Sequence, residues 1–427
     1  MRRFRHADPD FSAAFTAFLA EPRGRPEDVD AAAAAVLAAV KADGLDAVLD
    51  FTRRFDRVEL TAETVRVTPE EIEAGVAQCE PEVREAIAFA AARIAAYHER
   101  QRPTDQRWTD EAGVELGWRW GPLDSVGVYV PGGRAAYPST VLMNCVPARA
   151  AGVGRIAMVT PPGRLEPAVL AAAREAGVTE IWRIGGAQAV AALAYGAGPI
   201  APVDKIVGPG NAYVTAAKRR LYGVVGLDAL AGPSEIVVVA DSDNDPEWIA
   251  GDLLSQAEHD PAAQSILITD SEAFADAVAE ALLRRLPGLS TGEDAATSWR
   301  DHGAIIIAPL SASPGLVNQI APEHVEFCTA DPESLASQVR HAGAIFLGRF
   351  TPEALGDYVA GSNHVLPTSR AARFQSGLSL FDFLKRTSII RADAAAFRRL
   401  GPHTVALAEA EGLPAHALSA ALRLPPA

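Results

Sequence analysis

Val-Gly-Val-Tyr-Val-Pro-Gly-Gly, residues 126–133, decides the fold class, because a short apolar run ends there in glycines. Further runs of this kind follow, and segments with helical periodicity separate them. Such alternation predicts a mostly parallel sheet with helices on its faces. The predicted strands are 126–130, 155–159, 180–184, 204–207 and 235–239, and the predicted helices are 139–151, 166–177, 187–195 and 211–222.

Glycines close several of these strands, at 131–133, 185–186 and 208–211. Glycine at such a point lets backbone N–H groups approach a phosphate or ribose at the start of the next helix. For any single one of them, an ordinary turn glycine is the simpler interpretation. Tyr213 stands where the third glycine of G-x-G-x-x-G would be, so a dinucleotide site here differs from the standard Rossmann fingerprint.

The composition is that of an ordinary globular protein, with 427 residues, 49% hydrophobic content and a net charge of −15. This charge argues against nucleic acid and anionic membranes as partners. Cys79, Cys145 and Cys328 lie far apart, which suggests neither a disulfide framework nor a cysteine-ligated zinc site. We find no export signal and no membrane span, and we expect a cytoplasmic location.

A second α/β run begins at residue 245 with a helix that Asp260-Pro261 ends, followed by a predicted strand at 264–269. On that helix Gln256 and His259 are three residues apart, so both project from one face near its C-terminal end. The two side chains could hold one metal ion, or they could form a surface pair.

Glu323 and His324 are adjacent in the stretch 318–327, beyond an apolar run at 304–310 that we predict to be a buried strand. Loops that leave buried strands often carry the chemistry of α/β proteins. The pair offers two proton acceptors whose ordinary pKa values lie on either side of about pH 6. Alone it could be a solvated surface pair, and the stretch 356–368 adds a predicted loop that contains Asp357 and His364.

The two ends of the chain are predicted to be helical. Residues 26–100 read as a helical lead-in, in which 68–71 has the spacing of a capping box. The C-terminal tail contains Glu411 and His416 but no core of its own. Such a tail usually packs on something else, often a second subunit.

With these stretches assembled, the sequence resembles the histidinol dehydrogenase family nearly from end to end. Long ordered strings are far more specific than a short pattern. The matching strings are D-F-T-R-R-F-D at 50–56, V-G-V-Y-V-P-G-G at 126–133, V-D-K-I-V-G-P-G-N at 203–211, A-G-P-S-E at 231–235, S-Q-A-E-H-D at 255–260, A-P-E-H-V-E at 321–326, G-D-Y-V-A-G-S-N-H-V-L-P-T at 356–368 and E-G-L-P-A-H at 411–416.

The resemblance implies two Rossmann-like, aldehyde-dehydrogenase-like α/β domains with parallel sheets and small helical segments at both ends. We expect an N-terminal helical segment, a catalytic and metal-binding domain, an NAD-binding domain and a helical tail that contributes to the partner subunit's site. In that order, they comprise residues 1–25, 26–104 together with 235–380, 105–234 and 381–427.

The resemblance also implies a homodimer that oxidises L-histidinol through the aldehyde and its hydrate to L-histidine, with two NAD molecules used in turn and one zinc ion per site. His324 would take the hydroxyl proton, and Glu323 would activate water. The implied zinc ligands are Gln256, His259, Asp357 and His416; the further substrate contacts are Ser234, His324 and Glu411; and the NAD contacts are Tyr129, Gln188 and Asn211. Nitrogen and oxygen donors suit zinc, with Mn²⁺ or Co²⁺ as plausible substitutes.

Four alternatives remain open from the sequence. Cys145 could form a thiohemiacetal, as in aldehyde dehydrogenases, although it lies in an apolar helical run that favours a packing role. A zinc hydrolase could use the same metal ligands, but it gives the glycine-ended strands no task. A relative of the same fold could oxidise another small alcohol. A non-catalytic binding protein fits worst, because every expected polar residue is present.

Overall fold

The glycine-ended strands form one parallel sheet in the computed structural model, which describes residues 1–23, 29–132, 137–229 and 232–425. Its strand order is β6-β5-β4-β7-β8, so the direction of winding reverses between β4 and β7. The carboxyl ends at such a reversal are where ligands bind in open α/β sheets. The strands are β4 (Ser125–Tyr129), β5 (Arg155–Val159), β6 (Glu180–Trp182), β7 (Lys205–Val207) and β8 (Gly226–Leu227); the helices are α6 (Pro138–Ala151), α7 (Pro167–Ala176), α8 (Gly186–Tyr195) and α9 (Ala212–Arg220). The predicted strands and helices of this region are thus confirmed.

A second parallel sheet, with the order β1-β11-β10-β9-β12-β13, forms the other α/β unit. Apolar cores cover both of its faces. Its strands are β1 (Arg2–Arg5), β9 (Glu235–Ala240), β10 (Gln264–Thr269), β11 (Ala304–Ile307), β12 (His324–Cys328) and β13 (Ala344–Leu347). Its helices are α1 (Phe11–Ala20), α10 (Pro246–Ala257), α11 (Glu272–Arg285), α12 (Gly292–His302), α13 (Ser313–Ile320), α14 (Pro332–Ala336) and α15 (Glu353–Tyr358). Two parallel-sheet α/β units were predicted, and both are present.

The first residues are not all helical as we predicted for 1–25, because β1 pairs in parallel with β11. Only Phe4 of this four-residue strand is apolar, and its ring packs against the rings of Phe11, Phe15 and Phe18 on α1. A strand this short with one partly buried side chain has no periodicity to detect.

The helical lead-in is present as α2 (Val29–Asp43), α3 (Leu45–Phe55), α4 (Pro69–Gln78) and α5 (Pro81–Glu99). The capping box at Thr68 is confirmed, since its hydroxyl accepts from the Glu71 N–H and its own N–H donates to the Glu71 carboxylate. These helices pack against the first sheet and its helices, not against the second sheet. Our assignment of 26–104 to the catalytic domain was therefore wrong, because amphipathic periodicity marks a buried face without naming its partner.

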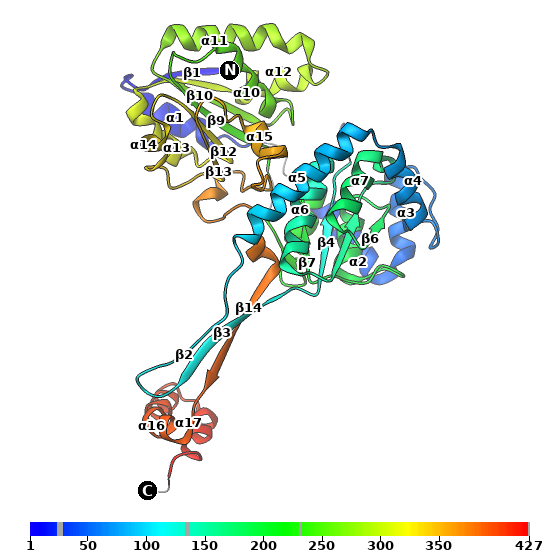
Figure 1. The fold of residues 1–427 in the computed structure, drawn as a ribbon, viewed down its shortest axis with the longest axis vertical. Coiled ribbons are helices and arrows are strands. Elements are labelled where there is room, and N and C mark those ends of the chain that lie inside the picture. The colour runs from blue at the N-terminus through cyan, green and yellow to red at the C-terminus, as the bar shows by residue number, and fades with distance from the viewer. Residues whose placement is uncertain (24–28, 133–136, 230–231, 426–427) are drawn as a thin grey trace.

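A third, antiparallel sheet with the order β14-β3-β2 leaves both α/β units as a long arm. It consists of β2 (Gln106–Thr109), β3 (Glu115–Pro122) and β14 (Leu384–Arg391), and it carries α16 (Ala394–Ala410) and α17 (Pro414–Ala421) at its far end (Figure 1). Residues 106–122 therefore lie outside the α/β unit to which we assigned them, and the C-terminal tail is not entirely helical. Most of β14 is exposed, so it lacks the alternation that marks a half-buried strand.

None of the helices in the described part of the chain is both long enough and apolar enough to cross a membrane.

Candidate active site

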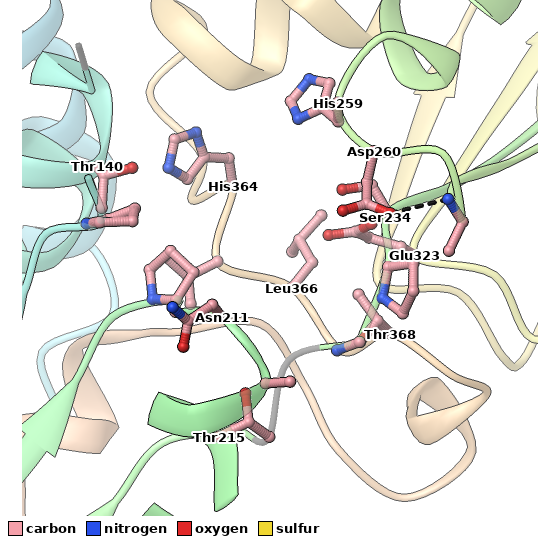
Figure 2. A pocket seen from close by; sticks show the side chains of 18 of the residues that line it. Thr140, Asn211, Thr215, Ser234, His259, Asp260, Glu323, His364, Leu366 and Thr368 are labelled. Atoms are coloured by element: carbon pink, nitrogen blue, oxygen red, sulfur yellow. Dashed lines mark hydrogen bonds between the residues drawn. The ribbon is translucent and has the colours of Figure 1, made fainter. Parts of the chain in front are cut away.

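A cavity of about 760 Å³ lies between the two α/β units. Figure 2 shows Thr140 and Asn211 on the side of the first unit, with Ser234, His259 and Glu323 facing them from the second. A cleft between two α/β units with a few convergent polar groups is the usual form of a small-molecule site.

The two sheets present opposite ends to this cavity. The first sheet contributes segments that follow its strands, such as Pro209 to Asn211 after β7. The second contributes residues at the starts of its strands, with Ser234 just before β9 and His324 at the start of β12. We expected Glu323 and His324 on a loop leaving the strand at 304–310, and this placement was wrong. Helix α13 intervenes, so the pair enters a strand instead of leaving one.

His324 is held in one orientation by the neighbouring strand. It is only 2% exposed, and its Nδ1 lies 3.0 Å from the main-chain oxygen of Glu235. Because a carbonyl can only accept, Nδ1 must carry a proton and donate it there. Nε2 has no hydrogen-bond partner among the described residues and lies 3.7 Å from Oδ1 of Asp357. In the neutral ring, Nε2 is therefore the atom free to accept a proton from a bound molecule.

Glu323 and His324 are buried together and shift each other's titration. Burial raises the pKa of the Glu323 carboxyl to about 8, against the opposing effect of His324. Burial lowers the pKa of His324, but the carboxylates of Glu323 and Asp357 outweigh this effect and raise it to about 10. Nδ1 of His324 is 3.7 Å from Oε2 of Glu323. Paired groups with shifted pKa values in a cleft are typical of acid/base sites.

Three of the four predicted metal ligands line this cavity. Gln256 lies in the last turn of α10, His259 two residues beyond its end, and Asp357 on α15. Asp357 was expected on a loop, but its short helix is obscured in the sequence by Gly356. Gln256 is 1% exposed, yet its Oε1 has no partner among the described residues. A buried amide oxygen without a donor favours a cation beside it, and this mixed oxygen and nitrogen donor set suits zinc.

The sequence did not single out Glu353, which joins this cluster. His324, Glu353 and Asp357 each offer a ligand atom within 4.8 Å of the others. Glu353 is 1% exposed, and one carboxylate oxygen accepts from the Ser255 hydroxyl at 2.8 Å. Only its place four residues before Asp357 on the same helix could have indicated it.

The predicted cofactor contacts lie around the strand ends of the first sheet. Asn211 lines the cavity and caps α9, accepting from the N–H groups of Tyr213 and Val214 at 3.1 Å each. Tyr129, on β4, and Gln188, on α8, are buried and do not line the cavity wall. The Tyr129 hydroxyl accepts from the Gly186 N–H at 3.0 Å, and burial raises its pKa to about 12, which keeps the phenol neutral.

Gly208 explains why glycine ends β7. Its φ is +105°, and a Cβ at this position would lie 2.2 Å from the main-chain oxygen of Tyr129. The carboxyl ends of β4 and β7 can approach each other only if this residue has no side chain. At this position the turn does require glycine, and Gly132 and Gly133 belong to a segment whose residues 133–136 lie outside the described residues.

Cys145 does not reach the cavity. It lies on α6, fully buried in the apolar core of the first α/β unit, and burial raises the pKa of its thiol. A neutral thiol with no access to the cavity cannot act as a nucleophile. The packing role that the sequence favoured fits this environment, and the thiohemiacetal alternative does not.

Glu411 and His416 lie far from the cavity of their own chain, at the outer end of the arm (Figure 1). Both are exposed and line a second hollow of about 390 Å³ between α16 and α17. Exposed Leu407, Leu413 and Leu418 lie on these two helices and on the turn between them. The described chain therefore does not bring these two predicted site residues to the others.

Known proteins resemble this chain over nearly its whole length. A family model described as histidinol dehydrogenase matches residues 19–424. A histidinol dehydrogenase from Caulobacter vibrioides is 78% identical over 425 residues, which cover 100% of this chain and 99% of the relative. One from Rhodospirillum rubrum is 59% identical over 426 residues, with 99% and 98% covered. The crystal structure of histidinol dehydrogenase from Elizabethkingia anophelis matches with a TM-score of 0.93 at 34% identity, covering 99% of this chain and 98% of that one.

Proposed function

Since the chain belongs to the histidinol dehydrogenase family, we propose that it oxidises L-histidinol to L-histidine through L-histidinaldehyde, as a cytoplasmic, NAD- and zinc-dependent homodimer. Family membership makes the chain an oxidoreductase and excludes the hydrolase and the non-catalytic alternatives. The observation that carries the mechanism is His324, whose buried Nε2 lacks a partner among the described residues while Nδ1 is fixed as a donor.

His324 would act as the base in the first oxidation. An alcohol becomes an aldehyde when its carbon loses a hydride and its hydroxyl loses a proton. Nε2 would take that proton, and the Glu235 main-chain oxygen would hold the ring in place while it becomes charged. The nearby Glu323 and Asp357 carboxylates raise the pKa of His324 to about 10 and so favour the imidazolium. A zinc ion held by Asp357 would offset the charge of that carboxylate and favour the neutral ring, which can take the proton.

Glu323 would act between the two oxidations. Water must add to the aldehyde before a second hydride can leave, and a carboxylate can take the proton of that water. One Glu323 oxygen accepts from the Glu235 N–H at 3.0 Å, which fixes the carboxylate at the cavity wall. The second hydride and proton then leave the hydrate to give the acid.

The cofactors would complete this site. NAD would accept each hydride, and zinc would hold the imidazole and amine of the substrate so that the reacting carbon faces the nicotinamide. Gln256, His259 and Asp357 would bind the metal from one subunit, with His416 from the partner subunit as the fourth ligand. Ser234 and the partner subunit's Glu411 would make the further substrate contacts, and Tyr129, Gln188 and Asn211 would bind NAD.

Removal of one proposed ligand should reduce metal content as well as activity. In Gln256→Ala, the cavity loses the amide oxygen that has no partner, and we expect metal affinity to fall by about tenfold or more. Gln338→Ala, which changes an exposed glutamine, is the matched control. Metal per subunit would be measured after dialysis against a series of zinc concentrations. An unchanged zinc isotherm for Gln256→Ala would remove this residue from the ligand set.

A further inference from the structure

Glu235, the first residue of β9, lies directly behind the Glu323–His324 pair and is not among the residues that the resemblance assigns to the site. It is 3% exposed. One carboxylate oxygen accepts from the Arg23 guanidinium and, at 3.0 Å, from the Ser369 N–H. The other oxygen accepts from the Glu323 N–H at 3.3 Å. A buried carboxylate is thus fully engaged by three donors from three separate segments.

The main chain of Glu235 contacts the same pair. Its N–H donates to Oε2 of Glu323 at 3.0 Å, and its carbonyl accepts from Nδ1 of His324 at 3.0 Å. Glu235 and Glu323 therefore form a reciprocal pair of hydrogen bonds, in which each carboxylate accepts from the main-chain N–H of the other residue. The starts of β9 and β12 are joined at this point by side chains in addition to the strand pairing.

Arg23 supplies the positive charge that this arrangement needs. It lies beyond α1, outside both sheets, and lines the cavity. Its side chain is 13% exposed, and that of its partner Glu235 is 4% exposed. Two carboxylates buried side by side repel each other and are poorly solvated, so a cation beside Glu235 stabilises both. The pair is far more buried than the exposed ion pair of Arg174 and Glu73.

We infer that Glu235, neutralised by Arg23, is a positioning residue that sets the Glu323 carboxylate for addition of water to the aldehyde. This inference rests on the proposed function and concerns one half-reaction of it. Glu235→Gln removes the charge that pairs with Arg23 and leaves one acceptor oxygen where two served Arg23 and the Glu323 N–H, but it keeps the main-chain contact with His324. The two half-reactions should therefore respond unequally.

The test measures both half-reactions separately, oxidation of the alcohol and oxidation of the added aldehyde, in the full-length enzyme. Wild-type enzyme comes first, because its failure to oxidise the aldehyde would contradict the proposed function itself. Glu235→Gln should then slow aldehyde oxidation by about tenfold or more and alcohol oxidation much less. A merely structural role would reduce both by the same factor, and equal loss overturns the inference.

Arg23 variants give the second arm of the test and remain available should Glu235→Gln fail to fold. Arg23→Gln leaves a buried carboxylate uncompensated and should slow the aldehyde step, whereas Arg23→Lys keeps the charge and should recover most of the rate. The double variant Arg23→Gln/Glu235→Gln has no unpaired buried charge. Its loss of aldehyde-oxidation rate should therefore be smaller than the product of the losses in the two single variants. Arg174→Gln is the control for removing an arginine. If the loss of rate in the double variant equals the product of the two single losses, or if Arg23→Lys does not recover the rate, Arg23 and Glu235 do not act together and the inference is overturned.

Discussion

Glu323→Gln is expected to slow oxidation of added L-histidinaldehyde by about 10²-fold or more, the usual loss for a general base. Gln keeps the shape of Glu323 and can still accept from the Glu235 N–H, but it cannot take a proton from water. The first hydride transfer should fall much less, because His324 keeps its contact with the Glu235 main chain. Single-turnover NADH formation from each substrate would be compared.

Asn318→Asp serves as a control for this comparison. It also exchanges an amide and a carboxyl group, in the reverse direction, and it lies in the same stretch of sequence at a residue that does not line the cavity. Both half-reactions should remain close to those of wild-type enzyme. If Glu323→Gln slows the two half-reactions by the same factor, the assignment of this residue to the aldehyde step is wrong.

Two variants that are defective in the complete conversion of L-histidinol to L-histidine, Glu323→Gln and His416→Ala, should regain this conversion when they are unfolded and refolded together. The reason is position, because His416 lies at the far end of the arm while Glu323 lines the cavity. If the arm of one chain completes the cavity of the other, each hybrid dimer has one site with both residues intact. Random pairing makes half of the dimers hybrids, so about a quarter of the wild-type sites should work.

A matched mixture tests whether the recovery comes from shared sites. Glu323→Gln refolded with Asp357→Asn carries both changes in the body of the chain, so neither site of the hybrid is intact and the mixture should stay inactive. Wild-type enzyme that is unfolded and refolded alone shows how much activity the refolding procedure itself recovers. If the refolded mixture of Glu323→Gln and His416→Ala recovers no activity, each chain uses its own His416.

The sequence predicted the two parallel sheets well, because their strands are continuous apolar runs. Strands β5 and β10 begin and end where the apolar runs at 155–159 and 264–269 do. Strand β14 was missed because most of its side chains are exposed, so the strand has no buried face to detect. The partner of the lead-in helices was also wrong, since periodicity locates a buried face and not the sheet that covers it.

The site could be predicted only in part. The motif strings indicated His324, Gln256, His259 and Asp357, which the fold brings to one cavity. Glu235 was quoted in such a string, yet its role depends on a cross-strand pairing that no local pattern contains. Arg23 reaches it from 212 positions away in the chain. Contacts between distant segments become visible only when the sheet order is known.

The yield of NADH per molecule of L-histidinol consumed tests the proposed function most directly. With NAD in excess and the alcohol limiting, a site that uses both His324 and Glu323 should form two NADH for each alcohol and leave L-histidine as the product. A yield of one NADH, with the aldehyde accumulating, would contradict the account and indicate a simple alcohol dehydrogenase.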